Sequence, residues 1–377
     1  MSGPLEGLKV LELAGIGPAP YACMLLADLG ADVLRLERGD PDASGVTQEI
    51  LNRSRPSVAI NLKNDAARAL VLELCEQADV LIEGFRPGVT ERLGLGPEEM
   101  WARNPRLVYG RMTGYGQEGP LSQRVGHDIN YIGISGALWA IGREFDKPVP
   151  PMNLVGDFGG GAMFLVFGVL AAVWAAQRTG EGQVVDAAMV DGSASLLSMM
   201  HSFINGGSWL EERGTNLLDT GAPFYEVYET KDSQFVAVGA IEPKFYKELL
   251  LGLGVKDDEL PSQWERGQWP NMKERFKDIF LTKTRDEWTE IFQDVDACVT
   301  PVLSPREATS HPYNTQRQVY TDGEAPQPSP APRFSKTPGS ISQSPRPAGS
   351  GTRDGLASWG VSDERIAALR DAGAFDQ

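Results

Sequence analysis

The chain of 377 residues has few cysteines, few histidines and a shortage of positive charge. Its three cysteines, Cys23, Cys75 and Cys298, are odd in number and far apart. This pattern argues against a disulfide framework and fits reduced thiols, so a cytoplasmic protein is expected. The net charge of −16 argues against nucleic acid as a partner, because no positive field would hold its phosphates. The three histidines show no metal-ligand spacing, so no metal site is predicted.

Targeting and membrane-spanning signals are also scarce. The opening residues, MSGPLEGLKV, lack the basic and apolar regions of a signal peptide. One run, residues 158–176, carries no charge and is long enough to span a bilayer. Three glycines stand at its start, no second span exists and its flanks show no basic asymmetry. We therefore expect no membrane association, and a helix buried in a domain or at a subunit interface.

The first half of the chain alternates apolar strands with helical stretches, which is typical of parallel βαβ units. Helices are predicted at residues 20–29 and 65–76, the second with Asp65 as its cap. The predicted strands span residues 8–13, 33–36, 57–61, 80–82, 107–111 and 184–189. This pattern predicts an α/β fold with a large domain over residues 1–190.

A second, smaller α+β domain is predicted after a Gly-rich linker at residues 191–224. Its limits are 225–305, and it is followed by a returning linker at 306–330 and a C-terminal arm at 331–377 that packs back on the large domain. Residues 322–352 are rich in proline and serine, and a short helix capped by Ser362 follows. Within the smaller domain, strands are expected at 225–229, 235–240 and 298–302, and helices at 243–252, 271–281 and 284–293.

The turn GIGPAP follows the first strand and resembles part of a dinucleotide-binding fingerprint, with Glu37 at the end of the second strand. However, Pro20 replaces the third glycine, and Pro18 and Pro20 remove two N–H groups that could face a pyrophosphate. A tight strand-to-helix turn without NAD is the better interpretation.

His127 in GHDINY and Asp157 in LVGDFGGG are the residues best suited to acid–base chemistry. An imidazole and a carboxylic acid can together move a proton on and off a weakly acidic carbon. Simpler interpretations stand beside this one. Asp157 could cap the apolar helix, His127 could be a hydrogen-bonded structural residue, and Glu242 before Pro243 could also be a helix cap.

Several motifs together carry a family resemblance. In order they are LKVLELAGIGPAPYACMLLADLGADVLRLERGD, NLK, VLIEGFRPGVTERLGLG, MTGYGQEGPLSQRVGHDINY, VGDFGGG and VVDAAMVDGS. This series resembles the class III CoA-transferase superfamily, and within it the α-methylacyl-CoA racemases. The resemblance covers essentially the whole chain and is weakest after residue 322.

The resemblance implies a CoA thioester substrate, a large Rossmann-like domain and an interlocked homodimer. In such a dimer each active site lies between the large domain of one subunit and the small domain of the other. The implied CoA contacts are Ile16, Arg38, Ile60, Lys63, Gly84, Val89 and Arg92. Arg38, Lys63 and Arg92 suit phosphates, although each taken singly could be a solvated surface cation.

Within the superfamily, His127 is the residue that decides between subfamilies. Members that transfer CoA use the carboxylate matching Asp157 as a nucleophile, and they are not expected to have histidine at the position matching His127. The resemblance therefore implies racemisation of 2-methyl-branched acyl-CoA thioesters, with no cofactor beyond the CoA of the substrate. Asp157 and His127 would act on opposite faces of the α-carbon, Glu242 would orient His127 and Asp128 would assist. The glycine-rich segment 157–161 would offer N–H donors to the enolate. The alternatives are a CoA-transferase, a non-catalytic acyl-CoA-binding protein and, least favoured, an NAD-dependent dehydrogenase.

Overall fold

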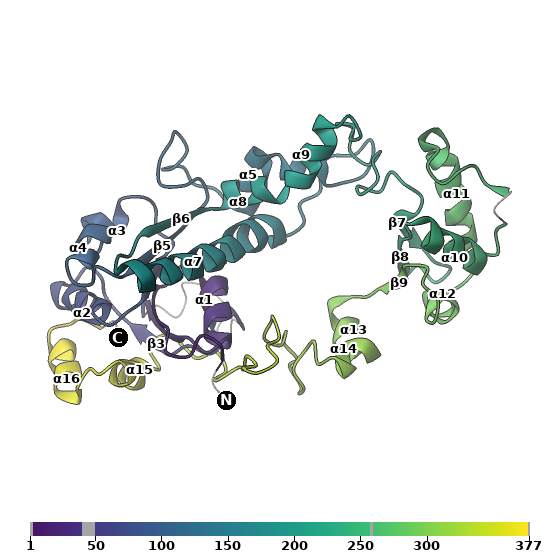
Figure 1. Cartoon of the computed structure of the whole chain (residues 1–377). Coiled ribbons are helices and arrows are strands. Elements are labelled where there is room, and N and C mark those ends of the chain that lie inside the picture. Colours follow the sequence, from purple (N-terminus) through teal and green to yellow (C-terminus); the bar gives the residue numbers. More distant parts are fainter. Residues whose placement is uncertain (1–2, 40–49, 257–258, 376–377) are drawn as a thin grey trace. The chain divides into compact units, whose positions relative to one another are not determined.

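The computed structural model describes residues 3–39, 50–256 and 259–375, and the chain forms two compact units (Figure 1). The large unit comprises Met1–Ala137, Pro151–Leu197 and Gln327–Gln377. The small unit comprises Leu138–Pro150 and Ser198–Pro326. The backbone therefore leaves the large unit twice and returns to it each time.

The large unit is built on a parallel sheet in the order β3-β2-β1-β4-β5-β6. All five strand pairings are parallel, which confirms the predicted α/β class. The strands are rich in Val and Leu because both faces of the sheet are covered by helices. Their bounds are Lys9–Leu13 for β1, Asp32–Glu37 for β2, Ser57–Ala59 for β3, Val80–Glu83 for β4, Val108–Thr113 for β5 and Val184–Ala188 for β6.

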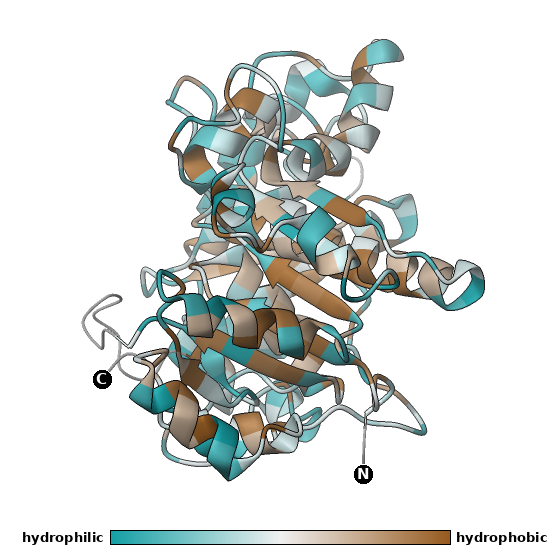
Figure 2. Ribbon diagram, turned by 90° about the vertical axis from the view of Figure 1, so that its left-hand side faces the viewer, coloured by the Kyte–Doolittle hydropathy of each residue, from teal (hydrophilic) through white to brown (hydrophobic). Residues whose placement is uncertain are grey.

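Successive strand residues point to opposite faces of the sheet and divide the large core in two. Leu11 and Leu34 face one cluster, which includes residues of α2, α4, α15 and α16. Val10 and Val33 face the other, which includes residues of α1 and α7. Figure 2 colours the strands between these layers brown, as expected for buried apolar residues. The helices are α1 (Pro18–Asp28), α2 (Asp65–Cys75), α4 (Pro97–Trp101), α7 (Met163–Thr179), α15 (Thr352–Ser358) and α16 (Asp363–Asp371).

The C-terminal segment completes the first of these clusters. Leu356, Trp359, Ile366 and Leu369 are buried in it. Ser362 accepts the N–H of Arg365 and so caps α16, as predicted. The buried Arg53 guanidinium pairs with Asp28 and also donates to the side chain of Gln327 and the carbonyl of Pro328, which fixes the start of the returning segment.

The small unit contains an antiparallel sheet in the order β7-β8-β9, with helices packed on it. The predicted strands and helices of this region are confirmed to within two residues at each end. The bounds are Tyr225–Glu229 for β7, Phe235–Gly239 for β8, Val299–Val302 for β9, Pro243–Leu253 for α10, Trp269–Phe280 for α11 and Arg285–Phe292 for α12. The shorter helices of the unit are α9 (Ser198–Asn205), α13 (Pro305–Ser310) and α14 (Pro312–Gln316), and α6 (Ala137–Ala140) begins at the boundary between the units.

Two predicted helix caps are wrong. Asn64, not Asp65, caps α2, because its side chain accepts the N–H groups of Ala66 and Ala67. Asp157 caps nothing, since the apolar helix begins earlier than predicted, as a π-helix over Leu154–Ala162 that continues into α7. A π-helix closes its hydrogen bonds over five residues, which a 3.6-residue period does not reveal.

The run Leu154–Thr179 is apolar and long enough to cross a membrane by length and composition, although a single such helix is weak evidence for a span. One face of α7 is buried through Leu165, Val169, Ala172 and Ala176. The opposite face exposes Met163, Phe167 and Trp174. The helix is therefore buried on one side only, which is less than the sequence led us to expect.

Candidate active site

The residues that the resemblance marks for CoA gather at the carboxyl edge of the parallel sheet. Ile16 follows β1, Arg38 follows β2, Ile60 and Lys63 follow β3, and Gly84 follows β4. Val89 and Arg92 bound the short helix α3 (Val89–Arg92) just beyond. The strand order reverses between β1 and β4, which is where open α/β sheets bind ligands.

These positions differ in what they offer a ligand. Arg38, Lys63 and Arg92 are exposed and free to approach an anion. Ile16 is 78% exposed and presents an apolar side chain at the tip of the first turn. Ile60 is only 1% exposed, because its side chain belongs to the core. Any contact from Ile60 must use its backbone.

The turn before α1 brings the first strand close to Asp157. Gly17 has a φ of 68°, which favours glycine. A Cβ at this position would lie 3.1 Å from Asp157 Oδ2. The rings of Tyr21 in α1 and Phe158 in the π-helix also pack together, with centroids 4.5 Å apart. The tight turn is thus used to seat the π-helix against α1.

His127 lies at the N-terminus of α5 (Asp128–Ser135) with its side chain exposed. Its N–H donates to Asn130 Oδ1 at 3.0 Å, and its carbonyl accepts the Asn130 N–H at 2.8 Å. These bonds fix the backbone and leave the ring to project from the helix end. The imidazole lies near enough to Asp157 for its charge to lower the pKa of that carboxyl.

Asp157 is half-buried in the middle of the π-helix. Burial raises the pKa of its carboxyl above the ordinary value, and the nearby charge of Asp128 raises it further. The Asn153 amide donates to Asp157 Oδ2 at 3.2 Å and acts in the opposite direction, as does His127. An aspartate in this position holds a proton more readily than a solvated one, which suits an acid–base role.

Asp128 supports the π-helix from α5. It is 6% exposed, and its Oδ2 accepts the Asp157 N–H at 2.7 Å. A Cβ at Gly156 would come within 2.4 Å of the same oxygen, so glycine is needed there. Asp128 Oδ1 is buried without a hydrogen-bond partner among the described residues. Asp128, the predicted assisting residue, therefore contacts Asp157 by accepting a hydrogen bond from its backbone.

Two N–H groups of the glycine-rich segment are not free, contrary to the expectation from sequence. The Asp157 N–H is bonded to Asp128, and the Phe158 N–H donates to the carbonyl of Asn153 at 3.3 Å. The segment lies inside a helix rather than at its start, where unpaired N–H groups occur. The N-terminal end of the helix, which is the positive end of its dipole, still lies in this region.

The π-helix packs against α8 (Met189–Leu196) through glycines. A Cβ on Gly160 would lie 2.6 Å from the backbone nitrogen of Ser193, and one on Gly192 would lie 1.8 Å from the carbonyl oxygen of Gly160. Two larger residues could not approach so closely. The position of Asp157 is therefore set by backbone packing on α8.

Glu242 belongs to the small unit. It is exposed, immediately before α10, and its side chain does not cap that helix. Glu242 thus occupies the N-cap position of α10, as the simpler interpretation expects, but its side chain forms no capping hydrogen bond. Its charge raises the pKa of Cys298 in the same unit, after the larger effect of burial.

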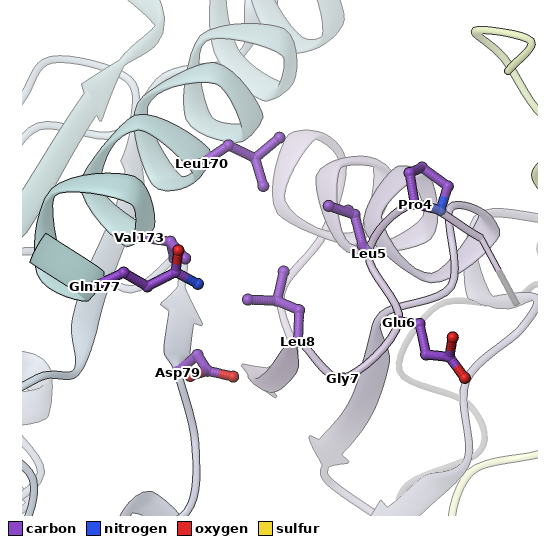
Figure 3. Close-up of a pocket in the computed structure, with 9 residues that line it drawn as sticks. All are labelled: Pro4, Leu5, Glu6, Gly7, Leu8, Asp79, Leu170, Val173 and Gln177. Atoms are coloured by element: carbon purple, nitrogen blue, oxygen red, sulfur yellow. The ribbon is translucent and has the colours of Figure 1, made fainter. Parts of the chain in front are cut away.

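A cavity of about 290 Å³ lies elsewhere, between α7 and the segment that leads into β1 (Figure 3). Leu5, Leu8, Leu170 and Val173 form its apolar walls, and Asp79 lies beside them. Asp79 directly precedes β4, so the cavity is at the amino ends of the strands. The residues marked for CoA lie at the opposite edge of the sheet, and the cavity is lined by none of them, nor by His127, Asp128, Asp157 or Glu242.

A family model described as CoA-transferase family III matches residues 5–352. The chain belongs to CoA-transferase family III. It is 46% identical over 368 residues to the α-methylacyl-CoA racemase of Mus musculus, covering 97% of this chain and 96% of that protein. It is 44% identical over 365 residues to the α-methylacyl-CoA racemase of Homo sapiens, covering 96% and 95%.

The fold of family III is also seen in solved structures. A CAIB/BAIF family protein from Brucella suis superposes with a TM-score of 0.83, covering 95% of this chain and all of that chain. The two sequences share 22% identity, so this likeness concerns the fold alone.

Three features of this family III chain were missed from its sequence. Asn153, four residues before Asp157, was overlooked because the helix was expected to start after it. Tyr131 ends the motif GHDINY, in which only the histidine and the aspartate indicate chemistry. The third is the buried Arg111, which pairs with the buried Glu83 and with the exposed Glu91 of α3. Burial raises the pKa of Glu83 to about 7, although Arg111 and the Phe85 N–H act in the opposite direction. Charged residues inside apolar strands were the available signal for this group.

Five methionines lie close to the motifs in the sequence, and core packing is the role that their apolar side chains predict for most of them: Met152, Met163, Met189, Met199 and Met200. Only Met189 is buried, while Met152, Met163 and Met199 are at least half exposed. The exposed thioethers of Met152 and Met163, which flank the π-helix in the large unit, leave an adaptable apolar surface.

Proposed function

We propose that the protein is an α-methylacyl-CoA racemase that interconverts the 2R and 2S forms of 2-methyl-branched acyl-CoA thioesters. One observation carries the proposal: an exposed imidazole lies near a half-buried carboxyl whose pKa is raised, close to the turn that follows the first strand of the parallel sheet. Two relatives at 44–46% identity over nearly their whole length are named for this activity.

The reaction is a transfer of one proton off the α-carbon and another onto its opposite face. In one direction the imidazole of His127 takes the α-proton. The electron pair of the broken C–H bond moves into an enolate whose negative charge rests on the thioester oxygen. The protonated carboxyl of Asp157 then delivers a proton to the opposite face. In the reverse direction the two residues exchange roles.

The electrostatics of Asp157 support its alternating roles as acid and base. A carboxyl that must alternate between acid and base works best when its pKa approaches the working pH. Burial and Asp128 raise the pKa of Asp157, and Asn153 keeps a donor on the anion. The positive end of the π-helix also favours the developing enolate charge.

The thioester would be held through its CoA portion. We assign the phosphates to Arg38, Lys63 and Arg92, because these cations stand exposed at the edge of a protein whose overall field repels anions. Ile16, Gly84 and Val89 would contact the remainder of the CoA portion, and Ile60 would do so through its backbone. The reaction as written involves only proton transfers and calls for no further cofactor.

The active protein is further proposed to be an interlocked homodimer in the cytoplasm. The face of α7 that carries Met163, Phe167 and Trp174 leaves an apolar stripe exposed, which a second copy would cover. Glu242 from the small unit of that copy would pair with His127 and orient it. The thiols Cys23, Cys75 and Cys298 are all free, in keeping with a reducing compartment.

Incubation of a single enantiomer of a 2-methylacyl-CoA with the protein in deuterated water tests the function. Deuterium uptake at the α-carbon with loss of optical purity is expected, read by mass spectrometry and chiral analysis. His127→Ala and Asp157→Ala should each slow racemisation about 10²–10⁴-fold. Acyl-CoA affinity should change little, since neither side chain is assigned to the CoA portion.

Other outcomes point to other functions. A folded protein that binds the thioester but exchanges no α-proton would overturn the racemase proposal. Transfer of CoA to an added carboxylic acid, lost in Asp157→Ala and kept in His127→Ala, would indicate a transferase with Asp157 as nucleophile. Binding without either reaction would leave an acyl-CoA-binding protein.

A further inference from the structure

Tyr131 is a buried residue of α5 that the mechanism above does not use. It is 8% exposed and lies in the second core cluster of the large unit. Its hydroxyl donates to the carbonyl of Gly126, the residue that precedes His127. Its backbone N–H also donates to the carbonyl of His127 at 3.3 Å. One residue therefore holds the backbone on both sides of the imidazole.

The ring of Tyr131 fills space that two glycines leave open. A Cβ at Gly114 would lie 2.0 Å from Tyr131 Cε1, and a Cβ at Gly126 would lie 2.8 Å from the same atom. Neither glycine has a positive φ, so the nearness of the ring, not backbone conformation, requires glycine at both positions. The ring of Tyr115 meets it edge-on, with centroids 5.0 Å apart.

The hydroxyl stays protonated at neutral pH and keeps its role as a donor. Burial raises the pKa of Tyr131 to about 12, with the charges of Tyr115, Asp157 and Asp128 adding to the effect. Between β5 and α5 the chain forms no helix or strand, so regular hydrogen bonding does not fix the approach to His127. The tyrosine supplies that constraint.

We propose that Tyr131 is the positioning residue for His127, with its hydroxyl and ring fixing the backbone from which the imidazole projects. The inference rests on the proposed racemase function. It concerns His127 first, because Asp157 is also seated by the packing of the π-helix on α8, in which Tyr131 takes no part. Loss of this constraint should therefore slow proton exchange on one face of the α-carbon more than on the other.

Tyr131→Phe tests the proposal, since it keeps the ring and removes the hydroxyl. Racemisation should fall about tenfold in kcat with KM nearly unchanged, because a small displacement of a catalytic group is costly. In deuterated water, each enantiomer can also exchange its α-proton without inversion by using the base on its own face. Exchange of the enantiomer that loses exchange in His127→Ala should fall, and exchange of its mirror image should persist.

Two further variants keep the test decisive. Gly126→Ala would place a methyl group against the Tyr131 ring and displace it. This variant should give the same unequal exchange of the two enantiomers, even if Tyr131→Phe folds poorly. Tyr115→Phe removes a hydroxyl for which the described residues provide no hydrogen bond, and it should behave like the unmodified protein. Thermal unfolding of each variant separates loss of fold from loss of positioning.

The outcomes distinguish the inference from the function beneath it. If the unmodified protein exchanges neither enantiomer, the racemase proposal fails. If it racemises but Tyr131→Phe and Gly126→Ala retain full kcat, or slow exchange of both enantiomers equally, Tyr131 does not position His127.

Discussion

At the scale of single residues, Asp157 is governed by neighbours that oppose each other. Burial and Asp128 favour its protonated form, whereas Asn153 and His127 favour the anion. Asp128 is itself placed by its bond to the backbone N–H of Asp157. The acidity of this carboxyl is therefore a property of a small group spread over α5 and the π-helix.

Asn153→Ala should move the acid limb of the pH–rate profile to higher pH. The amide donates to Asp157 Oδ2 and lowers the pKa of that carboxyl, so its removal raises the pKa. A bell-shaped profile of kcat/KM reports the free enzyme, and its acid limb would titrate Asp157. A limb that stays in place or moves to lower pH would contradict this account. Asn130→Ala in α5 is a suitable comparison, because it removes a side chain that bonds to His127 rather than to Asp157.

At the scale of elements, the π-helix and α8 act as one unit joined by glycine. Gly160→Ala should destabilise the protein by about 1–3 kcal/mol, since the added methyl would press on Ser193. The resulting shift of the π-helix should also lower racemisation. Gly133→Ala in α5 is the control. Open space surrounds it, so the substitution should stabilise by about 0.5–1 kcal/mol. Urea denaturation measures both, and equal stability of the two variants would refute the packing argument.

The strands and the longest helices could be predicted from sequence, because apolar periodicity and caps such as Ser362 are local signals. The π-helix could not, since its hydrogen bonds span five residues and the glycines that permit it resemble those of a helix start. The relation of His127 to Asp157 was found through family motifs, as nothing local joins positions thirty residues apart. The buried Arg111 group and the anchoring hydroxyl of Tyr131 depend on which side chains meet across strands and turns, which a single sequence does not state.

At the scale of the whole molecule, the proposed dimer rests on the apolar stripe of α7. Trp174 is 64% exposed, and a carboxylate there would have to be buried without a partner if a second copy covers the helix. Trp174→Glu should therefore produce monomers in sedimentation at micromolar concentration and lower racemisation with them. Leu251→Glu in α10 is the matched control, because it places the same charge at an exposed apolar residue beside Lys247. If Trp174→Glu sediments as the unmodified protein does, α7 is not the interface.

The route of the chain through the large unit bears on its biosynthesis. Leu356, Trp359, Ile366 and Leu369 close a core whose other walls are formed by β1, β2 and α2. A ribosome translates those walls early and supplies these four side chains only after the entire small unit. One face of the nascent sheet thus waits uncovered while that unit is made, and such a surface is open to aggregation. The protein should depend on chaperones during translation more than its finished core suggests.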